Sequence, residues 1–246
     1  MVLDMIFGTV GGLGLFLFGM LQMSDGLKKV SGQRLKNILK SMTKKRLVGF
    51  FIGAAITGLI QSSSATTVMV IGFINAGLLT LKQAIPVIIG TNVGTTVTAW
   101  LVSISGLQAF KITAYALPAV AVGFGLDVFG KKQTIRDIGR ILLGFGILFI
   151  GIGFMKEAFS PLKESQGVQE VLIWFGRNPF FAVLAGTVIT MMLQSSSASI
   201  AMIQMLALQG AFGNDWNRVL PIVIPFILGD NLGTTITDQR ASLQTT

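Results

Sequence analysis

Long apolar segments without a charged residue make up most of the chain. The longest are residues 5–24, 47–81, 83–110, 112–126, 141–155 and 178–214. Several exceed the ~20 residues with which a helix spans the hydrocarbon core of a bilayer. The pattern therefore predicts an all-α polytopic membrane protein. The first segment follows Asp4 and no basic residue, so a membrane helix is expected there rather than a cleaved signal peptide.

Two identical polar pentapeptides interrupt this apolar pattern. Gln-Ser-Ser-Ser-Ala occupies residues 61–65 and again residues 194–198. Hydrocarbon offers no hydrogen-bond partner to hydroxyl and amide groups, so a run of polar side chains at membrane depth indicates a polar cavity or a ligand. Hydrogen bonding between packed helices is the simpler explanation for one serine-rich segment. Two matched segments favour a binding site.

The pentapeptides are part of a longer internal repeat. Residues 14–19 align with 146–151 at an offset of 132, and residues 86–96 align with 225–235 at an offset of 139. The pentapeptides themselves align at 133. Order and spacing are thus kept over most of the two halves, which is typical of transporters built from internal repeats.

The repeat predicts three parts of the chain. Residues 1–128 form repeat 1, residues 129–140 a basic cytoplasmic connection, and residues 141–246 repeat 2. Each repeat is expected to contain spanning helices, an amphipathic interfacial helix and a re-entrant helical hairpin with the pentapeptide at its tip. Two full spans in place of each hairpin are an alternative. The span at 112–128 has no counterpart in repeat 2, so a shortened chain or a homo-oligomer that completes the bundle is expected.

The charge distribution predicts how the repeats are oriented. The net charge is +9, and twelve of the 19 basic residues lie in residues 25–46 and 129–140. The positive-inside rule places both segments on the cytoplasmic side of the inner membrane and the N-terminus outside. The counterpart of the first segment, residues 156–177, carries three basic and three acidic residues. The two repeats are therefore expected to have an inverted topology, with a binding site near the midplane.

The motifs resemble those of the type II sodium/phosphate cotransporter family in its bacterial form. Each pentapeptide is followed by a proline and then by Thr-Asn-Val-Gly-Thr-Thr at 91–96 or Asp-Asn-Leu-Gly-Thr-Thr at 230–235. The resemblance covers nearly the whole chain. It implies a sodium-coupled symporter of inorganic phosphate that works by alternating access, with its site where the hairpin tips meet. A sodium-coupled carrier of another small anion or solute, a passive channel and a regulatory membrane subunit are the alternatives.

The polar side chains of these motifs are the candidate substrate- and ion-binding residues. They are Gln61, Ser62, Ser63, Ser64, Thr91, Asn92, Thr95, Thr96, Gln194, Ser195, Ser196, Ser197, Asp230, Asn231, Thr234 and Thr235. Sodium needs oxygen ligands, which amide and hydroxyl groups supply. The residues expected to bind sodium are Gln61, Ser64, Gln194, Ser197 and Asp230.

Phosphate needs hydrogen-bond donors. Serine hydroxyls and the amide groups of Asn92 and Asn231 are candidates, as are the N-termini of half-helices that begin near Ala65 and Ala198. No Lys or Arg lies in the motifs, so co-bound sodium is expected to balance the charge of the anion.

Asp230 is the one acidic residue in a repeated motif, and its counterpart is Thr91. A carboxylate inside a membrane indicates a functional role, here as a sodium ligand or as an organiser of Asn231. A solvated position at the membrane interface is the alternative.

The composition argues against an enzyme. The chain has no Cys and no His, so it lacks thiolate chemistry and the usual base for a serine nucleophile. Residues 90–96 have the wrong glycine spacing for a phosphate-binding loop and lack its Lys. Sodium is expected as a coupling ion, without an enzymatic cofactor. The clustering of basic residues next to apolar segments indicates the lipid bilayer rather than nucleic acid as a partner.

Overall fold

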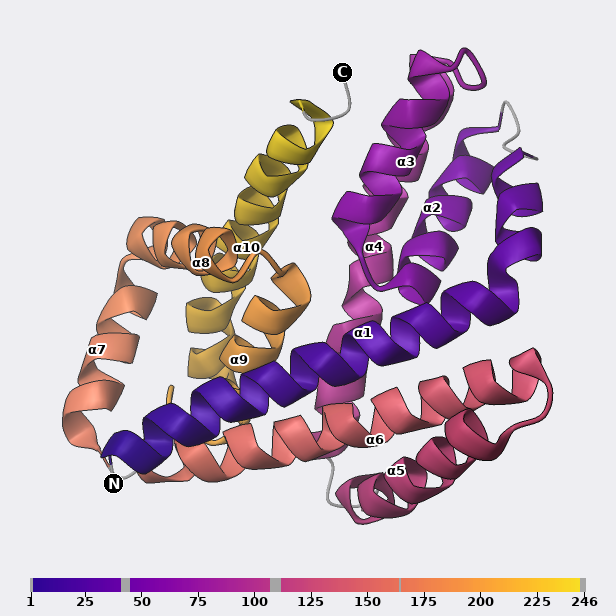
Figure 1. The fold of residues 1–246 in the computed structure, drawn as a ribbon. Coiled ribbons are helices and arrows are strands. Elements are labelled where there is room, and N and C mark those ends of the chain that lie inside the picture. Colours follow the sequence, from indigo (N-terminus) through magenta and orange to yellow (C-terminus); the bar gives the residue numbers. More distant parts are fainter. Residues whose placement is uncertain (1, 41–44, 107–111, 164, 244–246) are drawn as a thin grey trace.

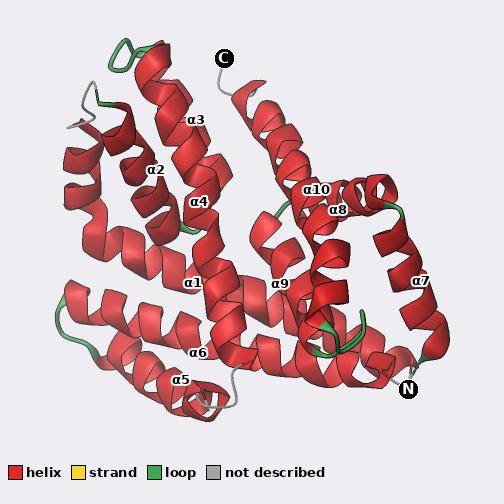
Figure 2. Ribbon diagram, turned by 180° about the vertical axis from the view of Figure 1, so that it is seen from behind, coloured by secondary structure: helices red, strands yellow, loops and turns green. Residues whose placement is uncertain are grey.

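The computed structural model describes residues 2–40, 45–106, 112–163 and 165–243, and every regular element in these ranges is a helix (Figure 1 and Figure 2). The α-helices are α1 (Val2–Lys40), α2 (Arg46–Ile60), α3 (Ser63–Asn75), α4 (Leu81–Gly106), α5 (Ile112–Phe129), α6 (Gln133–Phe159), α7 (Gln166–Arg177), α8 (Pro179–Leu193), α9 (Ser196–Leu208) and α10 (Trp216–Leu243). A 3₁₀-helix, η1 (Ser160–Lys163), follows α6. The all-α prediction is confirmed.

Four of the described helices are long and apolar enough to cross a bilayer. The candidate spans are Leu3–Ser31, Leu81–Ser105, Gln133–Phe159 and Trp216–Ile236, in α1, α4, α6 and α10. Large apolar side chains on these helices are exposed, for example Phe7 and Trp100 at 68% each. Lipid solvates such a surface, whereas water does not. The chain is therefore a polytopic membrane protein.

Helices α1 and α6 run side by side in opposite directions (Figure 1). Glycines allow the close contact: a Cβ atom on Gly12 would lie 2.9 Å from the carbonyl oxygen of Gly151, and one on Gly144 would lie 2.5 Å from that of Gly19. Gly144 and Gly151 are the repeat counterparts of Gly12 and Gly19. Each helix thus presents the same face to the other. Two related segments of opposite direction pack in this way around a two-fold axis.

Two bundles of three helices lie next to each other above this pair in Figure 1. One contains α2, α3 and α4, and the other contains α8, α9 and α10. Their packing is equivalent: a Cβ atom on Gly53 would lie 2.0 Å from the carbonyl oxygen of Val87, and one on Gly186 would lie 2.1 Å from that of Phe226. These two glycines therefore make equivalent contacts in the two bundles.

The helices that flank the pentapeptides are short. α2 and α8 have 15 residues each, and α3 and α9 have 13 each. At ~1.5 Å per residue, none is longer than ~23 Å, which is less than the ~30 Å of the hydrocarbon core. These lengths favour re-entrant hairpins over two full spans.

Helices extend into both basic segments of the chain. The basic segment at 25–46 was expected to contain an amphipathic interfacial helix. Helix α1 continues without interruption to Lys40, and its last turns bend away in Figure 1. Residues 41–44 lie outside the described part of the chain. The basic connection at 129–140 is mostly helical, because α6 begins at Gln133. Continuous hydrogen bonding along one helix outweighed the change from apolar to basic residues in both places.

Candidate functional site

Each polar pentapeptide ends a helix at its glutamine. Gln61 and Gln194 have φ angles of 56° and 53°, and no other non-glycine residue in the described ranges has a positive φ. A left-handed conformation costs a residue with a Cβ atom roughly 1–2 kcal/mol. Because this cost recurs at two equivalent positions, it indicates a functional requirement.

A serine then caps the helix that follows. The Ser62 hydroxyl accepts a hydrogen bond from the N–H of Ala65 at 3.2 Å, and the Ser195 hydroxyl accepts one from the N–H of Ala198 at 3.3 Å. Helices α3 and α9 begin directly after these serines, slightly earlier than the sequence indicated. The remaining N–H groups of a first helical turn have no partner within the helix, so they are available to an anion.

The two breaks meet at one small cavity of about 60 Å³. It is lined by Gln61, Ser62, Ser63, Ser64, Gln194, Ser195, Ser196, Ser197 and Thr234. None of these side chains is charged. One water molecule needs roughly 10–15 Å³ of such space, so the cavity accommodates a few small species. Residues 133 positions apart in the sequence thus line one cavity.

Thr98 of α4 joins the two halves of this site. Its hydroxyl donates to Oε1 of Gln61 at 2.6 Å and lies 3.3 Å from Oγ of Ser197. Thr98 is 1% exposed. The sequence-based candidates did not include it, although it lies on the same helical face as Thr91 and Thr95. That spacing of four and three residues was the available signal.

A second polar contact between the repeats lies further along the same helices. The side-chain amide of Gln204, in α9, donates to the carbonyl oxygen of Ala99 at 3.1 Å and to the hydroxyl of Ser103, both in α4. Its own oxygen is buried without a hydrogen-bond partner among the described residues. Helices α4 and α9 are therefore linked by side chains from both repeats.

Asp230 is fully buried beside this region. One of its carboxyl oxygens accepts a hydrogen bond from Thr190, and Ser199 lies beside it. The other carboxyl oxygen and the Ser199 hydroxyl have no hydrogen-bond partner among the described residues. The interfacial, solvated alternative for Asp230 therefore does not hold. A buried carboxylate with an unpaired oxygen is suited to a cation.

Repeat 1 has a neutral version of the same cluster. The counterparts of Thr190, Ser199 and Asp230 are Thr57, Thr66 and Thr91, and all three are buried. The hydroxyls of Thr57 and Thr66 are 3.2 Å apart, and the hydroxyl of Thr91 donates to a carbonyl of its own helix. The carboxylate is thus a real asymmetry between two equivalent sites.

Some predicted residues lie outside the cavity. The exposed ones are Asn92, Thr96, Asn231 and Thr235. The hydroxyls of Thr95, Thr96 and Thr235 donate to carbonyl oxygens of the preceding helical turn, which satisfies them locally. Asn92 and Asn231, the expected amide donors to phosphate, do not line the cavity, because the helical period turns them away from the face that carries Thr91 and Asp230.

Comparison with known proteins now identifies the family. A family model described as Na+/Pi-cotransporter matches residues 15–157 and 161–246. The chain belongs to this family. Its members are transporters, and the motifs that line the cavity lie within the matched residues. No solved structure shows a significant match.

Several relatives match different shares of the chain. "Uncharacterized protein YqeW" of Bacillus subtilis is 32% identical over 93% of this chain and 70% of its own length. "Putative inorganic phosphate export protein YjbB" of Escherichia coli (strain K12) is 24% identical over 90% of this chain and 39% of its own length. "Sodium-dependent phosphate transport protein 2B" of Homo sapiens is 40% identical over 31% of this chain and 11% of its own length. The chain thus spans well under half of the length of the relatives that are named for phosphate.

Proposed function

We propose that this protein moves inorganic phosphate across the membrane together with sodium. The observation that supports this most directly is the single uncharged cavity lined by both Gln-Ser-Ser-Ser segments. The family and the relatives named for phosphate supply the substrate. The chemistry of the lining supplies the reason for coupling.

The lining favours two ions over one. Phosphate carries up to two negative charges, and a dry cavity without a charged side chain does not stabilise it alone. Sodium bound at the amide and hydroxyl oxygens offsets that charge. The sodium ligands in this proposal are Gln61, Ser64, Gln194 and Ser197 in the cavity. Asp230, which is buried beside Thr190 and does not line the cavity, is proposed to bind sodium as well. The serine hydroxyls and the free N–H groups at the starts of α3 and α9 hold phosphate.

Alternating access fits the size and position of the cavity. A site of about 60 Å³ between two bundles has to open for its ligands to leave. The Thr98 and Gln204 contacts join the bundles at this point, so they break and re-form as the site opens. The matched contacts of the two repeats make an exchange between two equivalent arrangements reasonable.

Transport by reconstituted protein tests the proposal. Proteoliposomes with an inward sodium gradient are expected to accumulate radiolabelled phosphate, and those with an equal potassium gradient are not. Flux that only equilibrates phosphate, with or without sodium, would indicate a channel. Accumulation of sulfate in place of phosphate would indicate another substrate, and no flux in any condition would favour a regulatory subunit.

The direction of transport is a separate matter. The Escherichia coli relative is named as a putative phosphate export protein. A symporter transports in whichever direction the combined gradients favour. Vesicles loaded with phosphate and sodium are therefore expected to release phosphate when external sodium is removed. Phosphate efflux at the same rate with and without a sodium gradient would indicate export that is not coupled to sodium.

A further inference from the structure

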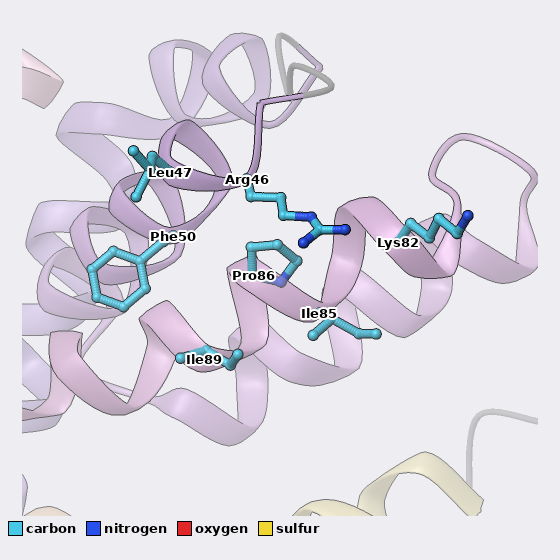
Figure 3. A pocket seen from close by; sticks show the side chains of 7 residues that line it. All are labelled: Arg46, Leu47, Phe50, Lys82, Ile85, Pro86 and Ile89. Carbon is cyan, nitrogen blue, oxygen red and sulfur yellow. The ribbon is translucent and has the colours of Figure 1, made fainter.

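A second, larger cleft lies between the first turns of α2 and α4, away from the serine-lined cavity. It has a volume of about 450 Å³ (Figure 3). Arg46 and Lys82 lie toward one end, and Phe50 and Ile89 lie toward the other. Neither Arg46 nor Lys82 belongs to one of the repeated motifs.

The side chains of Arg46 and Lys82 are not held by other side chains in the described part of the chain. Both are exposed, and neither forms an ion pair or a hydrogen bond with another residue of the described ranges. Helix α2 begins at Arg46, and its N-cap residue makes no side-chain capping hydrogen bond. Two cations and an uncapped helix N-terminus therefore converge where an anion would be stabilised.

The rest of the cleft is apolar. Leu47, Ile85 and Ile89 are 74%, 48% and 55% exposed, so the walls are open to lipid. A free inorganic anion gains nothing from such walls. A molecule with an anionic head and a hydrocarbon chain gains from both ends.

We propose that this cleft binds an anionic phospholipid. Its phosphate lies between Arg46 and Lys82, and an acyl chain packs along Phe50, Ile85 and Ile89. Basic pockets beside membrane helices hold anionic headgroups through this combination of charge and apolar contact. The base of the first hairpin is thereby anchored to one leaflet.

The internal repeat provides a built-in comparison. In repeat 2 the positions equivalent to Arg46 and Lys82 are Pro179 and Pro221. The positions equivalent to Leu47, Ile85 and Ile89 remain apolar as Phe180, Ile224 and Leu228. The apolar walls are thus common to both repeats, whereas the cation pair belongs to one. The anionic lipid site is expected at one hairpin base and not at the other.

Native mass spectrometry of the whole protein in detergent tests this. Phosphatidylglycerol is expected to bind at least about tenfold more tightly than phosphatidylcholine, at roughly 1 kcal/mol per basic residue. The R46Q/K82Q variant should lose that preference. The K131Q/K132Q variant makes the same change of charge at an exposed turn and should keep it. The R46K/K82R variant retains both charges and should also keep it, which separates lost charge from misfolding.

Three outcomes overturn the proposal. An equal loss in the K131Q/K132Q variant would show that net charge alone attracts the lipid. Equal binding of both lipids to the unmodified protein would remove the role of the cations. Displacement of phosphatidylglycerol by millimolar inorganic phosphate would assign the cleft to a free anion.

Discussion

At the scale of single residues, the least symmetric feature is Asp230. It is fully buried, shares a hydrogen bond with Thr190, and has a neutral counterpart in Thr91. The two clusters otherwise match in position and burial. A difference of one charge between equivalent sites gives them different affinities for a cation.

The D230N variant tests the role of this charge. The amide keeps the size and one oxygen but loses the charge, so the sodium concentration for half-maximal phosphate uptake is expected to rise about tenfold. Phosphate uptake at varied sodium measures it. The T91V variant, at the equivalent position of repeat 1, is expected to change sodium dependence far less. Unchanged sodium dependence in D230N would contradict the cation role.

Thr98 is the residue that connects the two pentapeptides. Replacing it with Val removes the donor to Gln61 and leaves a buried amide oxygen unpaired. Uptake at low phosphate is expected to fall roughly three- to tenfold. The T96V variant is the matched control, because the Thr96 hydroxyl is exposed and bonds to its own helix. Equal effects of the two changes would argue against a special role of Thr98.

At the scale of helices, the first helix of each hairpin packs closely against a neighbouring helix through a glycine. α2 contacts α4 at Gly53, where an added Cβ atom would lie 2.0 Å from a backbone oxygen. α8 contacts α10 at Gly186 in the same way. Backbone atoms cannot rotate aside as a side chain does, so these contacts fix the distance between helices.

The G53A variant is expected to lower the unfolding free energy by about 1–3 kcal/mol, because the helices have to separate. The midpoint of thermal unfolding in detergent measures the loss. Gly72 of α3 is the control, because a Cβ atom there would meet nothing within 4 Å, and G72A is expected to be neutral or slightly stabilising. A loss in G72A equal to that in G53A would show that the close backbone contact at Gly53 is not the cause of the lower stability.

At the scale of the whole molecule, the matched contacts of the two halves are consistent with one bundle being turned over relative to the other. α1 and α6 pack in opposite directions through equivalent glycines. The hairpins that follow would then enter the bilayer from opposite faces. The charge difference between residues 25–46 and 156–177 predicts the same arrangement.

Single cysteines test this orientation, because the chain has none of its own. Leu78, after α3, and Asn214, after α9, are exposed in equivalent loops. In cells treated with a membrane-impermeant thiol reagent, N214C is expected to react and L78C is expected to react only after lysis. Labelling of both from the same side would contradict the inverted topology.

How much could be predicted depended on whether a feature is local. The helix breaks at Gln61 and Gln194 followed from polar residues in an apolar segment, and the structure contains them. Thr98 was missed because its neighbours in sequence are ordinary residues of a membrane helix. Asn92 was selected with its motif, although the helical period places it on the exposed face.

The sequence by itself determined the membrane setting, the repeat and the polar breaks, because these depend on the solvent of each segment and on local backbone preference. Only the tertiary structure decided that both breaks line one cavity and that Thr98 joins them. It also decided that Asp230 is buried rather than solvated. Contacts between residues about a hundred positions apart depend on how helices pack, and hydrophobic periodicity does not specify that packing.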